Sequence, residues 1–325
     1  GIVACDAHPD YPSSWLAESL ARRHGARLLP LQHHLAHVAA VAAEHGRFPE
    51  PGERVLGIAL DGTGWGPDGS AWGGEWLELD GDLGWRRLAR LEPLLLVGGE
   101  AAVREPWRVA VAALVAAGEE HLLAATPVAE LVDGQRLRSV VRLAGDPGWP
   151  LASGAGRLFE AAGALLGLAP VNRWEGEAAA RLEAAAARAR GPIAAWPELL
   201  LPEGGALPEL PSARLLAAAA ARVAAGEDPA EVAAGFHATF CRLAAELTAR
   251  LELPAGTVFA LGGGCLVNRL LGEGLATALE AAGHSVLLPR ALPPGDGGLS
   301  YGQAVVAAVA AARGVEPRQV ERPIV

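Results

Sequence analysis

A mostly apolar run at residues 54–60 limits the folds that are open to this chain. It reads Arg-Val-Leu-Gly-Ile-Ala-Leu and ends in Asp61-Gly62-Thr63-Gly64. An apolar run without polar alternation is typical of a strand buried on both faces of a sheet. We therefore predict a central strand over residues 54–60 that leads into a loop at Asp61.

Strand-like and helical segments alternate along the chain, with glycine-rich loops between them, and the tryptophan- and glycine-rich residues 65–91 predict antiparallel hairpins. The clearest helix start is Asp228-Pro229-Ala230-Glu231, where Asp caps the helix and Pro takes its first position. Alternating strands and helices favour an α/β architecture. Since residues 100–188 are mainly helical in pattern, we predict two lobes. The first covers residues 1–99, and the second covers residues 100–325, with helical insertions and a returning C-terminal helix.

Charge and composition exclude several classes of protein. The 325 residues carry a net charge of −10, which disfavours non-specific binding to nucleic acid because phosphate neutralisation supplies most of that affinity. No stretch reaches the roughly 18 apolar residues of a membrane span, and no signal-peptide layout is present. The three cysteines have neither disulfide-framework nor zinc-finger spacing. We expect a cytoplasmic protein with reduced, buried thiols.

The start of the chain has the character of a fragment. The sequence contains no methionine, and residues 1–6 read as a strand that already runs into its loop. The sequence therefore predicts a natural fragment or a shortened protein.

Two histidines at the start of a predicted helix are candidate metal ligands. Gln32-His33-His34-Leu35-Ala36-His37 opens a helix over residues 32–44. The i, i+4 spacing of His33 and His37 places both imidazoles on one face, one turn apart, as two ligands of one ion require. His34 points about 100° away and is a poor third ligand. A packed or surface histidine cluster is the alternative.

Two aspartates at strand-to-helix loops are candidates for a third ligand. Asp296 lies in Pro293-Pro294-Gly295-Asp296-Gly297-Gly298, just before a predicted helix. Its alternative role is to cap that helix. Asp61 lies at the carboxyl end of the central strand, where ligands gather in open α/β sheets. Its alternative role is an ordinary Asp-Gly turn.

A run of three glycines indicates a nucleotide or phosphate loop. Gly262, Gly263 and Gly264 lie between an apolar strand and a helix. Unshielded N–H groups and the positive end of the helix favour a phosphate there. The run is neither a dinucleotide fingerprint nor a P-loop. Asn268, one turn into the predicted helix, either adds a side-chain hydrogen bond or is solvated.

Several strings, taken in order, resemble the carbamoyl-transfer domain of the hydrogenase-maturation family HypF over almost the whole chain. They are Cys5-Asp6-Ala7-His8-Pro9-Asp10-Tyr11, Gln32-His33-His34-Leu35-Ala36-His37, Asp61-Gly62-Thr63-Gly64-Trp65-Gly66, Arg104-Glu105-Pro106-Trp107-Arg108, Gly156-Arg157-Leu158-Phe159-Glu160, Glu175-Gly176-Glu177, Gly262-Gly263-Gly264 with Asn268, and Pro294-Gly295-Asp296-Gly297-Gly298.

The resemblance implies a fold and an activity. The fold is a TsaD-like, two-lobed α/β fold of the actin/sugar-kinase/chaperone-ATPase (ASKHA) type with a helix-rich second lobe. The activity is an ATP-dependent carbamoyl transfer. Carbamoyl phosphate and ATP give carbamoyl adenylate in a separate YrdC-like domain, and the carbamoyl group then passes to the C-terminal cysteine of the partner HypE. The partner's thiolate is the nucleophile, and AMP leaves.

The resemblance also assigns roles to single residues. It implies that His33, His37 and Asp296 hold a divalent metal, iron or zinc, and that Asp61 lies close to it as a catalytic residue. The implied adenosine pocket is lined by Gly262, Gly263, Gly264, Asn268, Glu160 and Gly176.

The chain departs from the family pattern at some positions. The family usually has Asp in place of Glu160 and Tyr in place of Trp174. In the family, acylphosphatase-like, zinc-finger and YrdC-like parts precede this domain, and the 325 residues do not contain them. Two alternatives therefore stay open: another TsaD-like carbamoyl or threonylcarbamoyl transferase, and a non-catalytic nucleotide- or metal-binding fragment.

Overall fold

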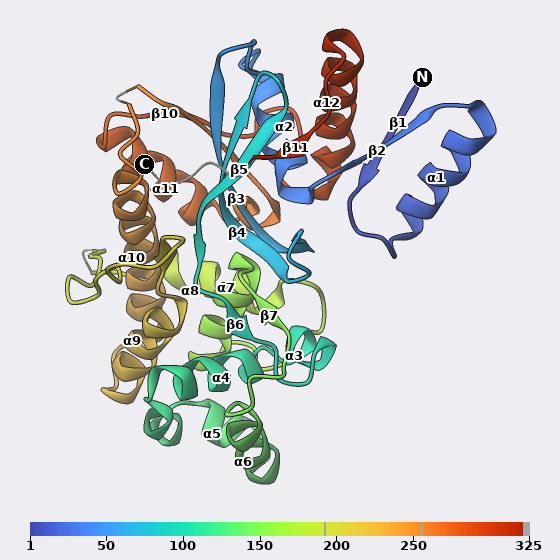
Figure 1. The fold of residues 1–325 in the computed structure, drawn as a ribbon. Coiled ribbons are helices and arrows are strands. Elements are labelled where there is room, and N and C mark those ends of the chain that lie inside the picture. The colour runs from blue at the N-terminus through green and yellow to red at the C-terminus, as the bar shows by residue number, and fades with distance from the viewer. Residues whose placement is uncertain (192, 255, 321–325) are drawn as a thin grey trace. The chain divides into compact units, whose positions relative to one another are not determined.

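Two compact units make up the part of the chain that the computed structural model describes, which is residues 1–320 except 192 and 255 (Figure 1). The first unit contains residues 1–90, 253–267 and 279–325, and the second contains residues 91–252 and 268–278. The predicted boundary near residue 100 lies close to the first crossing between the units. The contacts assign residues 253–267 and 279–325 to the first unit, whereas the sequence analysis had placed them in the second lobe.

A mixed sheet forms the centre of the first unit. Its strands lie in the order β10-β9-β3-β4-β5-β11. In that order they span Ser285–Leu287, Val258–Gly262, Arg54–Trp65, Ala71–Asp80, Gly84–Leu91 and Arg318–Gln319. β3, β4 and β5 are joined as antiparallel hairpins, as the sequence predicted, and β9 pairs with β3 in parallel. This parallel pairing is the reason that the C-terminal segment returns to the first unit.

The central strand is longer than predicted. β3 was expected to end at Leu60 in a loop, but it continues to Trp65. The register between β3 and β4 shifts between Leu60 and Gly64, which is the mark of a β-bulge. Bulges bend a strand and redirect its side chains. Asp61 lies in this bulge, and its carboxylate is directed to the place where the other candidate ligands gather.

A second, smaller sheet and three helices complete the first unit. β1 (Ile2–Asp6) and β2 (Arg27–Leu31) pair in parallel around α1 (Pro12–His24). Pro12 occupies the first turn of α1, where its missing N–H costs nothing. α2 (His33–Glu44) packs on α12 (Leu299–Arg313). A Cβ atom on Gly302 of α12 would lie 1.9 Å from the carbonyl oxygen of Ala36, so only glycine permits the two helices to approach this closely.

The core of the first unit lies between α2, α12 and the central sheet. Leu35, Val38 and Ala39 of α2 are fully buried against apolar side chains of the strands. Each large apolar side chain buried in this way contributes about 1.5–3 kcal/mol. The core therefore fixes the position of α2, which carries both histidines of interest.

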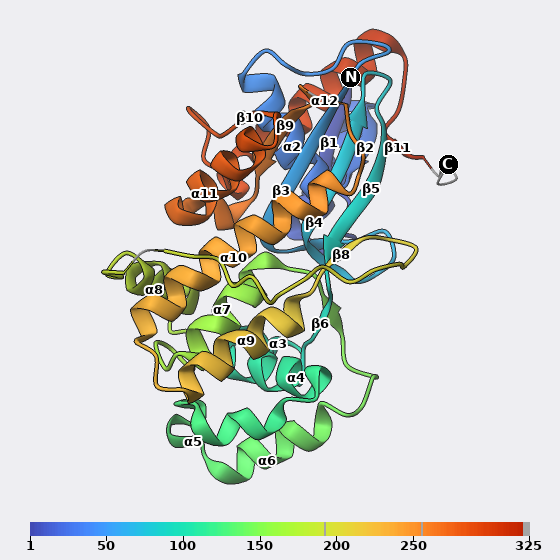
Figure 2. The same ribbon diagram turned by 90° about the vertical axis from the view of Figure 1, so that its left-hand side faces the viewer.

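The second unit is mainly helical (Figure 2), as the sequence predicted for residues 100–188. Its α-helices are α3 (Glu100–Arg104), α4 (Trp107–Ala117), α5 (Val128–Leu131), α6 (Gly134–Leu143), α7 (Ala155–Leu165), α8 (Glu177–Ala186), α9 (Ser212–Ala224) and α10 (Pro229–Ala249), with most of α11 (Arg269–Ala281). The 3₁₀ helix η1 (Glu120–Ala125) and the short strands β6 (Leu94–Leu95), β7 (Leu151–Ala152) and β8 (Glu209–Leu210) lie between them. The Asp228 side chain accepts the Ala230 N–H and caps α10, as predicted.

Two helix starts differ from the expectation. The glycine run does not lead directly into a helix, because the short 3₁₀ helix η2 (Gly264–Val267) lies between it and α11. Asn268 therefore stands at the start of α11 instead of one turn inside it. Similarly, η3 (Asp296–Gly298) precedes α12. None of the helices in the described residues is long and apolar enough to cross a membrane.

Candidate metal centre

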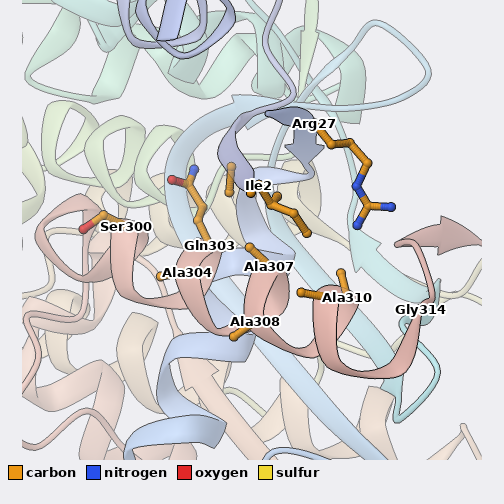
Figure 3. Close-up of a pocket in the computed structure, with 12 residues that line it drawn as sticks. Ile2, Arg27, Ser300, Gln303, Ala304, Ala307, Ala308, Ala310 and Gly314 are labelled. Atoms are coloured by element: carbon orange, nitrogen blue, oxygen red, sulfur yellow. The ribbon is translucent and has the colours of Figure 1, made fainter. Parts of the chain in front are cut away.

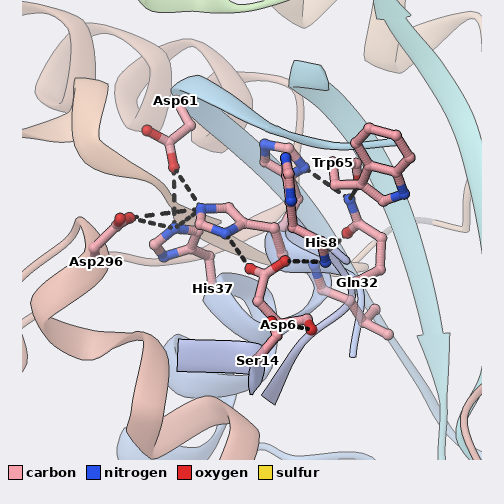
Figure 4. Close-up of polar contacts among 11 residues, drawn as sticks. Asp6, His8, Ser14, Gln32, His37, Asp61, Trp65 and Asp296 are labelled. Atoms are coloured by element: carbon pink, nitrogen blue, oxygen red, sulfur yellow. Dashed lines mark hydrogen bonds and ion pairs between the residues drawn. The ribbon is translucent and has the colours of Figure 1, made fainter. Parts of the chain in front are cut away.

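Four side chains from three segments of the first unit converge on one point (Figure 4). His33 and His37 come from α2, Asp61 comes from the bulge of β3, and Asp296 comes from η3. Each offers one ligand atom, and these four atoms lie within 4.8 Å of one another. The structure thus brings together the histidine pair and both aspartates that the sequence offered as separate candidates. We call these four residues the His/Asp cluster.

The distances within the His/Asp cluster are short and similar. Asp61 Oδ2 lies 3.3 Å from His33 Nε2 and 3.0 Å from His37 Nε2. Asp296 Oδ1 lies 3.5 Å and 3.6 Å from the same two nitrogens. The two Nε2 atoms are 3.3 Å apart. A tetrahedral ion with ligand bonds of about 2.0–2.2 Å separates neighbouring ligand atoms by about 3.3–3.6 Å, so the cluster has the dimensions of a single-ion site.

The start of α2 explains the placement of the histidines. Gln32 is the N-cap residue, and its side-chain oxygen accepts the Leu35 N–H at 2.9 Å. The cap fixes the first turn, and the i, i+4 spacing then brings the imidazoles of His33 and His37 to one face. His34 points elsewhere and lies 2.9 Å from the amide nitrogen of Gln32 through Nδ1. His34 therefore lies outside the group of converging side chains, and its exclusion from the ligands stays a prediction.

The alternative roles for both aspartates do not account for their side chains. No side-chain cap hydrogen bond is present at η3 or at α12, and the Asp296 carboxylate faces the histidines instead. Asp61 stands in a continued strand rather than a tight turn. Its Oδ1 accepts the Gly62 N–H at 2.7 Å, which leaves Oδ2 directed at the imidazoles.

The electrostatics of the His/Asp cluster favour charge on all four groups. Burial opposes charge on the His33 imidazole, but its hydrogen bonds with Asp296, Asp6 and Asp61 outweigh burial and raise its pKa to about 12. The same balance raises the pKa of His37. Hydrogen bonds with the two histidines hold the pKa of Asp296 well below its usual range. Without a metal, two protons therefore take the place that a divalent cation fits.

The cluster is enclosed on one side and open on the other. The side chains of His33 and His37 are 3% and 2% exposed, whereas that of Asp296 is 75% exposed. A bound ion would therefore be held by buried nitrogens and remain accessible past Asp296. This arrangement matches catalytic metal sites, which keep an open position, better than closed structural ones.

Sequence analysis missed one residue of this centre. Asp6, the last residue of β1, lies with Oδ2 2.7 Å from His33 Nδ1 and is itself buried. The signal that would have found it is the rule already used for Asp61, namely an aspartate at the carboxyl end of a strand. Its contact with His33 depends on the pairing of β1 with β2, which residue spacing along the chain does not reveal.

The glycine turn is more constrained than predicted. Gly263 has φ +102°, and a Cβ atom there would lie 2.3 Å from the carbonyl oxygen of Leu60. Its N–H donates to the carbonyl oxygen of Pro294 at 2.9 Å. The expectation of three unshielded N–H groups is therefore wrong for Gly263. Gly263 instead packs closely against Leu60 of β3, and its hydrogen bond to Pro294 holds the loop that carries Asp296.

The remaining predicted nucleotide residues lie in the second unit. Glu160 is buried in α7, where Asn172 donates to its Oε1 at 2.9 Å and Arg157 Nη2 lies 3.1 Å from its Oε2. Burial raises the Glu160 pKa, and hydrogen bonds that include one from the Gly176 backbone oppose the rise. Glu160 and Gly176 are thus brought together. Their role in nucleotide binding stays a prediction.

Asn268 is held by contacts inside the second unit. Its Oδ1 accepts the Leu271 N–H at 3.0 Å, and its Nδ2 lies 2.9 Å from His237 Nε2. His237 is buried and lies 2.8 Å from the Ala233 carbonyl oxygen through Nδ1, so it is a packed histidine. The solvated alternative for Asn268 is therefore wrong, since this side chain caps α11.

Two further features bear on the sequence analysis. Glu105 contacts Arg108 at 2.5 Å and Arg136 at 2.6 Å, so Arg108 of the Arg104–Arg108 motif takes part in an ion-pair network. Cys5 and Cys241 are buried as expected, but Cys265 is only half-buried. It follows the glycine turn directly, and such loops lie nearer the surface than the core.

A pocket of about 760 Å³ lies elsewhere in the first unit, between β1 and α12 (Figure 3). Small side chains of α12, among them Ala304, Ala307 and Ala311, face Ile2 and Ala4. Its lining contains no carboxylate and no imidazole, so it offers none of the groups on which the predicted chemistry depends.

Comparison with known proteins identifies the family. A family model described as "Carbamoyltransferase, Kae1-like Domain, second subdomain" matches residues 57–303, and one described as "HypF Kae1-like domain" matches residues 1–44. The chain is 41% identical over 305 residues to the carbamoyltransferase HypF of Rhizobium leguminosarum bv. viciae, which covers 93% of this chain and 37% of that protein. It is 40% identical over 316 residues to a HypF homolog of Cupriavidus necator, covering 94% and 77% respectively.

A solved structure agrees with the sequence comparison. Full-length HypF in its phosphate- and nucleotide-bound form superposes with a TM-score of 0.81 at 30% identity, covering 95% of this chain and 46% of that one. The fold is therefore the two-lobed, TsaD-like α/β fold of the ASKHA type that the resemblance implied. From the family models, the relatives and this structure together, the chain belongs to the HypF carbamoyltransferase family, within the Kae1-like region of its members.

Proposed function

We propose that this chain carries the carbamoyl-transfer step of [NiFe]-hydrogenase maturation. In this proposal the chain takes carbamoyl adenylate, derived from carbamoyl phosphate and ATP, and transfers the carbamoyl group to the C-terminal cysteine of a HypE-type partner. The observation that carries the proposal is the His/Asp cluster. Its dimensions fit one divalent ion, and it lies in a chain of the carbamoyltransferase family.

The chemistry of the cluster supports a resident metal. Two imidazole nitrogens and two carboxylate oxygens suit zinc or iron equally. His33, His37 and Asp296 would hold the ion. Asp61, held through Oδ1 by the Gly62 N–H, would complete the set or contact the substrate. When bound, such an ion supplies a Lewis acid for the carbamoyl or phosphate oxygens of the adenylate.

The nucleophile in this proposal comes from the partner. The thiolate sulfur forms a bond to the carbamoyl carbon, the bond from that carbon to the phosphate oxygen breaks, and AMP leaves with the electron pair. Two of the chain's three thiols are poorly suited to attack. Cys5 and Cys241 are buried, and burial raises the pKa of Cys241 to about 12. The role of the chain is therefore to bind and orient the adenylate beside the His/Asp cluster.

A nucleotide substrate is supported by a relative, since the solved full-length HypF is described as nucleotide- and phosphate-bound. In this chain we assign phosphate contacts to the turn of Gly262, Gly263 and Gly264, and adenosine contacts to Asn268, Glu160 and Gly176. The N–H of Gly263 already has a partner, so the assignment relies on the close backbone approach that glycine permits.

The test separates transfer from the earlier formation of the adenylate. Preformed carbamoyl adenylate is mixed with the chain and with a peptide that ends in cysteine, and the gain of a carbamoyl group is measured by mass spectrometry. Wild-type chain should carbamoylate the peptide, and His33→Ala with His37→Ala should abolish the reaction. A matched control replaces two exposed histidines, His24→Ala with His121→Ala. Undiminished transfer by the His33/His37 variant would contradict the proposal.

A further inference from the structure

The His8–Tyr11 loop follows β1 directly. It belongs to the motif of residues 5–11, to which the proposed function assigns no role. The bridge between this loop and the His/Asp cluster is the side chain of Asp6. Its Oδ1 accepts the backbone N–H of His8 at 2.8 Å, and its Oδ2 lies 2.7 Å from His33 Nδ1. One buried carboxylate thus has one oxygen on the loop and the other on a cluster histidine (Figure 4).

We infer that Asp6 is a positioning residue of the metal centre, which holds His33 in the form that binds metal and ties the His8–Tyr11 loop to it. This inference rests on the proposed function, since it assumes that the His/Asp cluster takes a divalent cation. It gives Asp6 a role that neither the predicted site residues nor the proposed function contains.

The geometry at His33 fixes the place of its Nδ1 hydrogen. A carboxylate oxygen only accepts, so the Nδ1 of His33 at 2.7 Å from Asp6 must carry the hydrogen. The other nitrogen, Nε2, lies 3.3 Å from Asp61 and 3.3 Å from His37, on the side where an ion would be bound. When a cation replaces the proton on Nε2, the Nδ1 hydrogen stays with Asp6 and the Nε2 lone pair faces the ion, as a metal ligand must.

The backbone explains why Asp6 reaches His33. β1 and β2 are parallel and in register, with Asp6 opposite Leu31, and α2 starts two residues later. The Ala7 N–H also donates to the Leu31 carbonyl oxygen at 2.9 Å. The end of β1 and the start of α2 are therefore held side by side, and the Asp6 carboxylate needs no flexible reach.

The other cluster histidine provides a comparison inside the same site. Among the residues that the structure describes, no carboxylate lies at ion-pair distance from Nδ1 of His37; Asp61, Asp296 and His33 all contact its Nε2. Only His33 has a carboxylate behind it. The effect of Asp6 on metal binding should therefore act through His33.

The loop that Asp6 holds is itself ordered by several contacts. The ring of His8 stacks on Tyr11 with centroids 4.0 Å apart and planes 3° apart, and it lies edge-on to Trp65 at 5.0 Å. The Trp15 indole N–H donates to the Pro9 carbonyl oxygen. Because Asp6 also accepts the His8 N–H, loss of its carboxylate should loosen the loop and His33 together.

The test measures zinc affinity on the full chain, with no activity assay. Metal-free wild type, Asp6→Ala and Asp6→Asn are titrated with Zn²⁺ in competition with a chelator. Loss of a carboxylate behind a ligating histidine typically weakens metal binding by about 10–100-fold. We expect that loss in Asp6→Ala and a smaller one in Asp6→Asn, whose amide oxygen can still accept one hydrogen bond. Asp10→Asn, in the same loop and exposed, should bind like the wild type.

A spectroscopic measurement separates positioning from mere support of the fold and needs no variant. In Zn²⁺-loaded wild type with ¹⁵N-labelled histidine, long-range proton–nitrogen NMR should show His33 protonated at Nδ1 and metal-bound at Nε2. The reverse assignment would overturn the inference. Zinc affinity equal to that of the wild type in both Asp6 variants would also overturn the inference, but it would not contradict the proposed metal site. A wild-type chain that binds no Zn²⁺ would instead contradict the proposed function and this inference together.

Discussion

Three acidic side chains, Glu160 and Glu177 of the second unit and Asp61 of the His/Asp cluster, show two ways of balancing a buried negative charge. In the second unit, Glu160 has Arg157 one helical turn before it, and Glu177 has Arg173 and Arg181 four residues away on either side. These partners are permanently charged and come from the same stretch of chain. In the first unit, Asp61 and Asp296 come from separate segments and face two histidines, which are charged only when protonated.

The difference separates ion pairs that are complete within one stretch of chain from a cluster that needs a cation. The charge of a glutamate with an arginine three or four residues away is balanced by that arginine, so the pair needs no added cation. The His/Asp cluster is balanced only while it holds protons or a cation. The first unit should therefore respond to metal and to pH in ways that the second unit does not.

The largest expected effect breaks the permanent pair in the second unit. Glu160→Gln leaves Arg157 as a buried charge without its partner, and this typically costs about 3–5 kcal/mol of stability. Urea unfolding should show the loss, while the zinc affinity of the folded chain stays unchanged. In the double variant Arg157→Met with Glu160→Gln, much of the stability should return. If both variants lose the same stability, the unpaired charge of Arg157 is not the cause of the loss.

A smaller effect is expected from adding metal to the first unit. A ligand at 100 times its dissociation constant stabilises the folded state by about 2.7 kcal/mol. Zn²⁺ should therefore raise the urea midpoint of the wild type and of Glu160→Gln by similar amounts. It should leave the midpoint of His33→Ala with His37→Ala unmoved. A zinc-dependent shift in that double variant would place the ion somewhere else.

The smallest effect, at most about 1.4 kcal/mol per pH unit for one group, is the pH dependence of the metal-free chain. His33 has its pKa raised from 6.5 to about 12, so its stabilising contribution is complete below pH 6.5 and declines as the pH rises toward 12. Asp61 has its pKa lowered from 3.8, so its contribution is complete above pH 3.8 and declines below it. The metal-free chain should therefore be most stable between pH 3.8 and pH 6.5, where both contributions are complete.

Zinc should reverse the alkaline part of this profile, because protons compete with metal for the histidines. Urea midpoints at a series of pH values, with and without Zn²⁺, test both parts. If the metal-free midpoint stays constant from pH 6 to pH 10, the cluster does not hold its protons as its geometry indicates.

Sequence spacing identified the parts of the centre that one helix or one loop defines. His33 and His37 were found because their geometry is fixed by a single helix. Asp61 and Asp296 were found as separate candidates, because each ends a strand or opens a helix. Asp6 was missed because it reaches His33 only through the register of β1 on β2. The contact of Asn268 with His237 depends in the same way on how α10 packs near the start of α11.

The types of secondary-structure elements were predicted more reliably than the residues at which the elements and the two units begin and end. The hairpins after residue 65 and the capped start of α10 followed from turn and cap chemistry. The extension of β3 through Asp61 did not, because a bulge permits the strand to pass through a sequence that usually makes a turn. The return of the C-terminal segment to the first unit depends on the pairing of β9 with β3, which no local pattern encodes.

The ligands of the His/Asp cluster lie near opposite ends of the chain, and this determines when the centre can exist. Chains fold from the N-terminus as they are synthesised, so α2 with its two histidines is complete long before η3 is made. A nascent chain therefore carries the histidine pair and Asp61 without Asp296. The centre closes only when α12 docks on α2, so capture of a metal ion would report that the last part of the first unit has reached its place.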